Sequence, residues 1–122
     1  MSRSTLRLII ILTTVATAFI HLVLLNLRLT QFNGQLTIDP AFTLNGLGFL
    51  SLLAALFFVK LPFLAGRETL LHYAYLAFTI ITLIAYFVVQ GGNAFTDTLG
   101  LITKAIEVVL LVALFLHLRA EA

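Results

Sequence analysis

Hydrophobic positions along the chain form four long apolar runs that are separated by short polar segments. The runs cover about residues 8–27, 41–59, 69–89 and 98–118, and each approaches the ~20 residues with which an α-helix crosses a bilayer. Because the connections are short, neighbouring helices should run in opposite directions. The pattern predicts an all-α membrane protein, an antiparallel four-helix bundle that forms one transmembrane domain over residues 1–122.

The composition agrees with this class and excludes others. Of 122 residues, 61% are hydrophobic and 10% are charged, whereas a soluble domain carries about 25% charged residues. The net charge of +2 is too small and too scattered to indicate binding of nucleic acid. With no cysteine, the chain has no disulfide, thiolate nucleophile or cysteine-based metal site. Phosphate-binding loops, metalloprotease motifs and nucleophile elbows are also missing from the sequence, so a protein that is not an enzyme is favoured.

The segment between the first two spans contains a turn signal. Asn33-Gly34 lies between two short β-prone runs, and both residues tolerate the positive φ of a type I′ turn. We therefore expect a short β-hairpin over residues 29–39, with an irregular loop as the alternative. Asp39 should cap the second helix, with Pro40 at its first position.

Positive residues are distributed unevenly around the spans. Arg28 is the only one in or beside the first and third connections. By the positive-inside rule, both termini should lie in the cytoplasm and the hairpin on the outer side of the inner (plasma) membrane. The first span is expected to be uncleaved, because its apolar run continues past the peptidase-like Ala16-Thr17-Ala18 to Leu27. The positive residues on the predicted cytoplasmic side are Arg3, Arg7, Lys60, Arg67 and Arg119.

Two charges lie within the fourth apolar run. Lys104 and Glu107 are three residues apart, so they share one helical face and can touch. A charge at the centre of a membrane helix costs roughly 2.5 to 3.5 kcal/mol on insertion scales, so these side chains should face a partner or water. Counted by depth along the helices, His21, Asn45 and Tyr86 fall in the same band. We predict one buried polar cluster of these five residues.

The cluster has two interpretations. It can be a structural group in which Glu107 and Lys104 pair, with His21 as a third member. Alternatively, Glu107 changes protonation, as intramembrane carboxylates and histidines do in proton relays. In the second case a polar path would continue toward the cytoplasm along the third span, although these side chains can also satisfy one another locally. The residues of that path are Thr17, His72, Tyr75, Thr79 and Thr82.

Two histidines raise a third hypothesis. His72 and His117 lie near the cytoplasmic ends of consecutive helices and could supply two axial ligands to a b-type haem. Interfacial histidines directed toward lipid headgroups are the alternative. We expect no other metal site.

Two segments carry a resemblance. Residues 44–50, Leu-Asn-Gly-Leu-Gly-Phe-Leu, and residues 97–107, which contain Lys104 and Glu107, are similar to segments of small four-helix prokaryotic integral membrane proteins of unassigned function. The resemblance implies the topology given above, and it transfers no functional residue.

For function, the first hypothesis is a small accessory or structural subunit of a membrane assembly, present as a homo-oligomer or in a larger complex within the lipid bilayer. The alternative is a proton- or ion-coupled carrier or channel that uses Glu107. A third hypothesis is an electron-transfer protein that binds b-haem or quinone.

Overall fold

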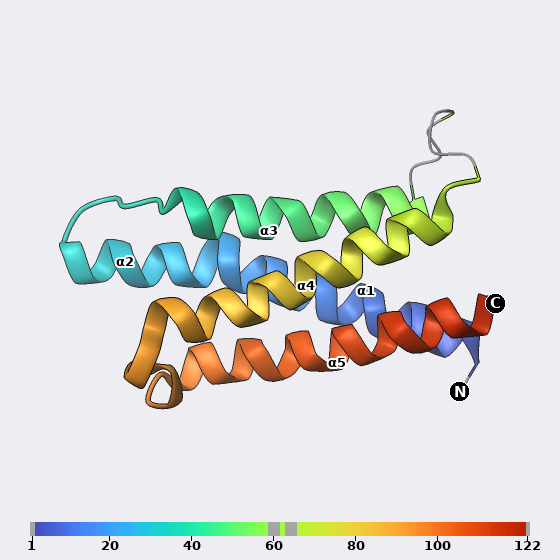
Figure 1. The fold of residues 1–122 in the computed structure, drawn as a ribbon. Coiled ribbons are helices and arrows are strands. Elements are labelled where there is room, and N and C mark those ends of the chain that lie inside the picture. The colour runs from blue at the N-terminus through green and yellow to red at the C-terminus, as the bar shows by residue number, and fades with distance from the viewer. Residues whose placement is uncertain (1, 59–61, 63–65, 122) are drawn as a thin grey trace.

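The computed structural model describes residues 2–58, 62 and 66–121, and its regular structure is helical. Four long helical segments lie side by side (Figure 1). The first is continuous from Arg3 to Asn33 and contains one turn of π-helix. The elements are α1 (Arg3–Phe19), η1 (Ile20–Leu24), α2 (Leu25–Asn33), α3 (Pro40–Leu53), η2 (Ala54–Phe58), α4 (Glu68–Gln90), η4 (Gly91–Phe95) and α5 (Thr98–Glu121).

All four segments are long and apolar enough to cross a membrane, with mean hydropathies between 1.8 and 2.6 in their most apolar windows. This confirms the predicted class, a helical protein with four candidate membrane spans. The first segment has 31 residues, and at ~1.5 Å per residue it is ~46 Å long, more than the ~30 Å hydrocarbon core of a bilayer. In a bilayer, a segment of this length would have to tilt or extend beyond the hydrocarbon core.

The four segments surround a narrow interior. α1 contacts α3 and α5, and α4 contacts the same two helices. Figure 1 shows the N- and C-terminal ends at one end of the molecule, which we call the terminal end. The end of α2 and the η4 turn lie at the opposite end, which we call the η4 end.

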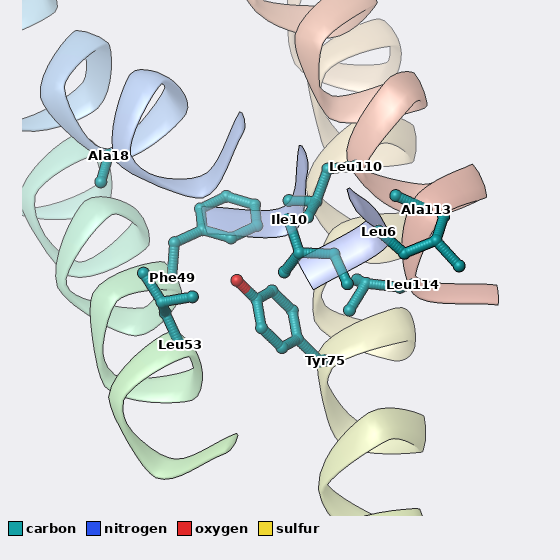
Figure 2. Packing of buried hydrophobic residues seen from close by; sticks show 9 residues of the cluster. All are labelled: Leu6, Ile10, Ala18, Phe49, Leu53, Tyr75, Leu110, Ala113 and Leu114. Atoms are coloured by element: carbon teal, nitrogen blue, oxygen red, sulfur yellow. The ribbon is translucent and has the colours of Figure 1, made fainter. Parts of the chain in front are cut away.

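The hydrophobic core is formed by buried side chains from all four segments (Figure 2). Leu6 and Ile10 of α1 are at most 2% exposed. They pack with side chains from the other three segments, and Figure 2 shows the Tyr75 ring among them. The remaining members of the core are Ala18, Phe49, Leu53, Leu110, Ala113 and Leu114.

The prediction of a β-hairpin over residues 29–39 is wrong. Residues 29–33 continue the helix through α2, and residues 35–39 contain no strand. Gly34 has a φ of +72°, and its N–H donates to the carbonyl of Thr30 at 3.0 Å. Asn-Gly is thus the end of a helix rather than a type I′ turn, because glycine in the left-handed region serves both structures equally well.

Capping side chains set the starts of two helices. Asp39 accepts a hydrogen bond from the N–H of Phe42 at 3.0 Å, with Pro40 in the first turn, as the sequence predicted. Asp97 accepts one from the N–H of Gly100 at 3.3 Å and so begins α5. Lys60, which the sequence places after the second span, lies outside the described residues.

Candidate functional site

The centre of the site is Glu107 in the middle of α5. Its side chain is fully buried. Lys104, one turn earlier, places Nζ 2.6 Å from Oε1 of this carboxylate. The hydroxyl of Thr17 in α1 donates to Oε2, also at 2.6 Å. The Glu107 carboxylate thus links α5 to α1 through Thr17, a residue 90 positions earlier in the sequence.

His21 forms the third side of this cluster. Its Nδ1 lies 2.8 Å from the carbonyl of Thr17. Because a carbonyl only accepts hydrogen bonds, Nδ1 carries the hydrogen and donates it. The other ring nitrogen, Nε2, lies 4.0 Å from Oε2 of Glu107. We call Thr17, His21, Lys104 and Glu107 the Glu107 cluster.

A local irregularity of the backbone accompanies His21. The residue lies in η1, where the helix widens to a π-helical turn between α1 and α2. Such single turns insert one extra residue and often occur at functional sites. The rings of Phe42 and Phe49 lie 6.5 and 6.3 Å from the imidazole, centroid to centroid, so two apolar rings lie close to the histidine.

A cavity of about 200 Å³ adjoins the cluster on the side of the η4 end. His21 and Lys104 line it directly, whereas Glu107 lies behind them and is not part of its wall. The wall is mainly apolar. Six of its side chains, which come from α2, α3 and α4, are Leu25, Phe42, Asn45, Thr82, Ala85 and Tyr86.

Asn45 in the cavity wall has an unusual hydrogen-bonding state. Its Nδ2 donates to the hydroxyl of Thr82 at 3.0 Å. Its Oδ1 is buried, and among the described residues it finds no hydrogen-bond partner. An unpaired buried acceptor costs about 1–3 kcal/mol.

An ion pair forms the rim of the cavity. Arg28 of α2 donates two hydrogen bonds to Asp97, at 3.0 and 3.1 Å, and the two side chains are 48% and 21% exposed. The hydrogen bonds from Arg28 lower the pKa of the Asp97 carboxyl below its ordinary value. Deeper in, Lys104 Nζ lies 5.1 Å from the centre of the Tyr86 ring, and Tyr86 donates to the carbonyl of Ala94 at 2.6 Å.

The sequence predicted one polar path, mainly along α4, and the structure places its residues in four groups, of which the pair of His72 with His117 is described below. Tyr75 is hydrogen-bonded to Thr14 of α1, and Thr79 donates to the carbonyl of Tyr75 at 2.8 Å. Thr82 bonds with Asn45, as described above. Thr17 belongs to the Glu107 cluster and lies about 4.5 Å along α1 from Thr14. The hydrogen bonds between described side chains therefore do not form an unbroken chain.

His72 and His117 come together near the terminal end. His72 Nε2 lies 2.7 Å from Nδ1 of His117, and the rings stack with planes 14° apart. Two axial nitrogens on one haem iron would be about 4 Å apart, since metal–nitrogen bonds are ~2 Å long. The two histidines in this arrangement do not fit a shared haem. Among the described residues, no group of three or more His, Asp or Glu side chains could hold a metal ion.

The five residues of the predicted polar cluster lie in two adjoining groups. The structure brings three of them, His21, Lys104 and Glu107, into the Glu107 cluster and puts Asn45 and Tyr86 in the adjoining cavity wall.

The sequence did not predict two of the contacts between helices. The bonds from Thr14 to Tyr75 and from Arg28 to Asp97 each join residues more than 60 positions apart. The only available signal was the helical spacing of Thr14, Thr17, His21 and Arg28, which marks an inward face without naming partners.

A family model matches residues 1–117 of the chain, and its description is a family of unknown function, DUF7475. The chain therefore belongs to this family. The match agrees with the resemblance to small proteins of unassigned function. No curated protein and no solved structure matches the chain.

Proposed function

We propose that this chain is a small proton-translocating membrane protein, a carrier or channel in which Glu107 takes up and releases the proton. The observation that carries the proposal is a fully buried carboxylate beside a cavity within a membrane-compatible bundle. Intramembrane carboxylates are rare and costly, and they are the usual groups of proton relays.

In this proposal, His21 carries the proton from the cavity to the carboxylate. His21 lines the cavity and also places Nε2 4.0 Å from Oε2 of Glu107. A neutral imidazole with its hydrogen on Nδ1 has a free lone pair on Nε2, so it can accept a proton from a hydronium ion in the cavity, which becomes water. A cavity of about 200 Å³ holds several waters at ~30 Å³ each. His21 then transfers the proton to Glu107.

The terminal side of the cluster offers a second set of polar groups. Thr14 and Tyr75 lie about one helical turn from Thr17, and the bonded pair of His72 and His117 follows nearer the termini. In this proposal, a bridging water or a rotation of the Thr14 hydroxyl completes the route during transport.

For topology, we propose an antiparallel bundle in the inner (plasma) membrane with both termini in the cytoplasm. Arg3, Arg7, Arg67 and Arg119 support this orientation, because the positive-inside rule favours cationic residues on the cytoplasmic side. The cavity and the pair of Arg28 with Asp97 would then face outward.

The test is proton flux into vesicles that contain the purified full chain, a pH-sensitive dye and a chloride buffer without organic acids. Under an imposed membrane potential, the wild type should acidify the lumen faster than protein-free vesicles, and Glu107→Gln should abolish the difference. Glu68→Gln is the matched control, because Glu68 is an exposed acid at the start of α4. Equal flux in wild-type and protein-free vesicles, or undiminished flux in Glu107→Gln, would contradict the proposal.

A second candidate function is a subunit of a larger membrane assembly or homo-oligomer. Only 17% of the most apolar window of Pro40–Phe58 is buried, against 39% in the first and fourth segments. The hydroxyl-bearing Ser51 in this helix is exposed. Small polar residues of this kind often lie between membrane helices. A native mass of the purified protein above that of one chain would support this candidate, and a monomer without partners would contradict it.

A further inference from the structure

One cation in the wall of the cavity next to the Glu107 cluster has its counterion outside the cavity. Lys104 lines the cavity wall, and its counterion Glu107 lies behind that wall, fully buried. The other permanent cation of the wall, Arg28, is already held by both oxygens of Asp97. The charge balance of the inner cavity is thus decided by the single contact from Lys104 to Glu107.

We propose that the cavity binds a small organic monoanion, a carboxylate with a short apolar body, and that it binds this anion together with the proton on Glu107. The inference rests on the proposed function, because it requires Glu107 to take up a proton. It adds the chemical class of the ligand.

Protonation of Glu107 changes the charge beside the cavity. When Glu107 is neutral, the Lys104 ammonium, 7% exposed as a residue, is left without a counterion in an environment of low dielectric constant. A buried unpaired charge is strongly unfavourable. An ammonium has three donors, and the hydrogen bond from Lys104 to Glu107 uses one. An anion in the cavity can therefore replace the lost carboxylate at Lys104.

Binding of the anion and of the proton is consequently cooperative. The anion favours the state in which Glu107 is neutral, and protonation of Glu107 favours the state in which Lys104 binds the anion. By thermodynamic linkage, each ligand must raise the affinity for the other by the same factor. A complex with one proton and one monoanion is electrically neutral relative to the empty cavity.

The walls select the body of the anion. Leu25, Phe42, Ala85 and Val89 give the cavity an apolar lining, which favours a hydrocarbon group over an inorganic ion. The volume of about 200 Å³ exceeds that of an engineered cavity of ~150 Å³ that binds benzene.

Other titratable and charged groups also line the cavity. α3 contributes Asn45, which does not titrate, and the remaining elements contribute one or two groups each. These groups are His21 in η1, Arg28 in α2, Tyr86 in α4, Asp97 before α5 and Lys104 in α5. Of these, His21 and Lys104 adjoin Glu107 directly, so the count of protons taken up with the anion must be compared between wild type and Glu107→Gln.

The test is binding of benzoate to the full chain in nonionic detergent, with benzamide as the uncharged analogue. Proton uptake is recorded in weakly buffered solution. The wild type should bind benzoate with uptake approaching one proton per anion, its affinity should fall up to tenfold per pH unit as the pH rises, and benzamide should bind at least tenfold more weakly. Glu107→Gln should bind benzoate without proton uptake and with little pH dependence, because its Lys104 is permanently unpaired.

Variants of Lys104 separate recognition from folding. Lys104→Gln should weaken benzoate binding at least tenfold, and Lys104→Arg should restore most of it. The inference is overturned if wild-type protein binds no benzoate, binds it without taking up protons, or binds benzamide equally well. If binding is absent while Glu107-dependent proton flux persists in chloride buffer, only this inference fails. If that flux is absent too, the proposed function fails with it. A chain that binds only long-chain fatty acids would also overturn the assignment to a small anion.

Discussion

Replacing Lys104 with methionine would leave Glu107 as a buried carboxylate without its cation. The two side chains are 9% and 0% exposed, and Nζ lies 2.6 Å from Oε1. Removing one partner of such a buried pair costs about 3–5 kcal/mol of unfolding free energy, because the remaining charge is uncompensated. The hydrogen bond from Thr17 remains, so we expect a loss near the lower limit, about 3 kcal/mol at neutral pH.

Two further variants make this prediction specific. Adding Glu107→Gln to Lys104→Met removes the second charge and should return the stability to within about 1–2 kcal/mol of wild type, since a buried ion pair as a whole contributes little. Arg67→Met changes an exposed cation and should alter stability by less than about 0.5 kcal/mol. The loss in the single variant should also shrink as the pH falls, because a protonated Glu107 is neutral.

The assay is reversible unfolding of the purified chain in mixed micelles, driven by a denaturing detergent and followed by far-ultraviolet circular dichroism. The reasoning would be refuted if Lys104→Met cost less than about 1 kcal/mol, or if the double variant were as unstable as the single one. Either result would mean that Glu107 does not carry an uncompensated charge in the absence of Lys104.

Three other predictions concern the rim, a helix end and the cavity wall. Arg28 lowers the pKa of Asp97, so the pair stabilises the fold at pH values above the ordinary carboxyl pKa, and this stabilisation is lost as the pH falls through the lowered pKa. Because the pair is exposed, the stabilisation should be less than about 1 kcal/mol. Asp97→Asn should abolish this pH dependence in a series of unfolding midpoints. Gly34→Ala should cost roughly 1–2 kcal/mol, because the φ of +72° strains any residue with a Cβ, and an unchanged midpoint would count against the αL helix end. Gly100→Ala places a Cβ 2.9 Å from ring atoms of Tyr86 and should cost about 1–3 kcal/mol by overpacking; unchanged stability and ligand binding would show that the ring moves freely.

Local patterns in the sequence predicted much of the fold. Apolar runs identified the four helical segments, because each run must be long enough to cross a bilayer. Spacing of three residues brought Lys104 and Glu107 together correctly, because that contact depends only on helical geometry. Asp39 identified the start of α3 for the same reason, since a cap acts within one turn.

These local patterns do not predict which side chains touch between helices. Thr17 reaches Glu107, and Thr14 reaches Tyr75, only because the helices are rotated and shifted to particular positions, which periodicity does not determine. The π-helical turn at His21 has no residue signature, and it changes which side chains face inward after it. The prediction of a hairpin failed because Asn33-Gly34 fits both a turn and a helix end. Which of the two forms depends on whether the helix continues through α2.

The most direct test of the central claim is whether Glu107 changes protonation inside the folded protein. Infrared difference spectra between acidic and alkaline pH report the C=O stretching band of protonated carboxylic acids. We predict a band in the wild type that persists in Glu68→Gln and disappears in Glu107→Gln, with folding checked by circular dichroism. An identical set of carboxylic acid bands in wild type and Glu107→Gln would show that Glu107 does not titrate, and it would contradict the account.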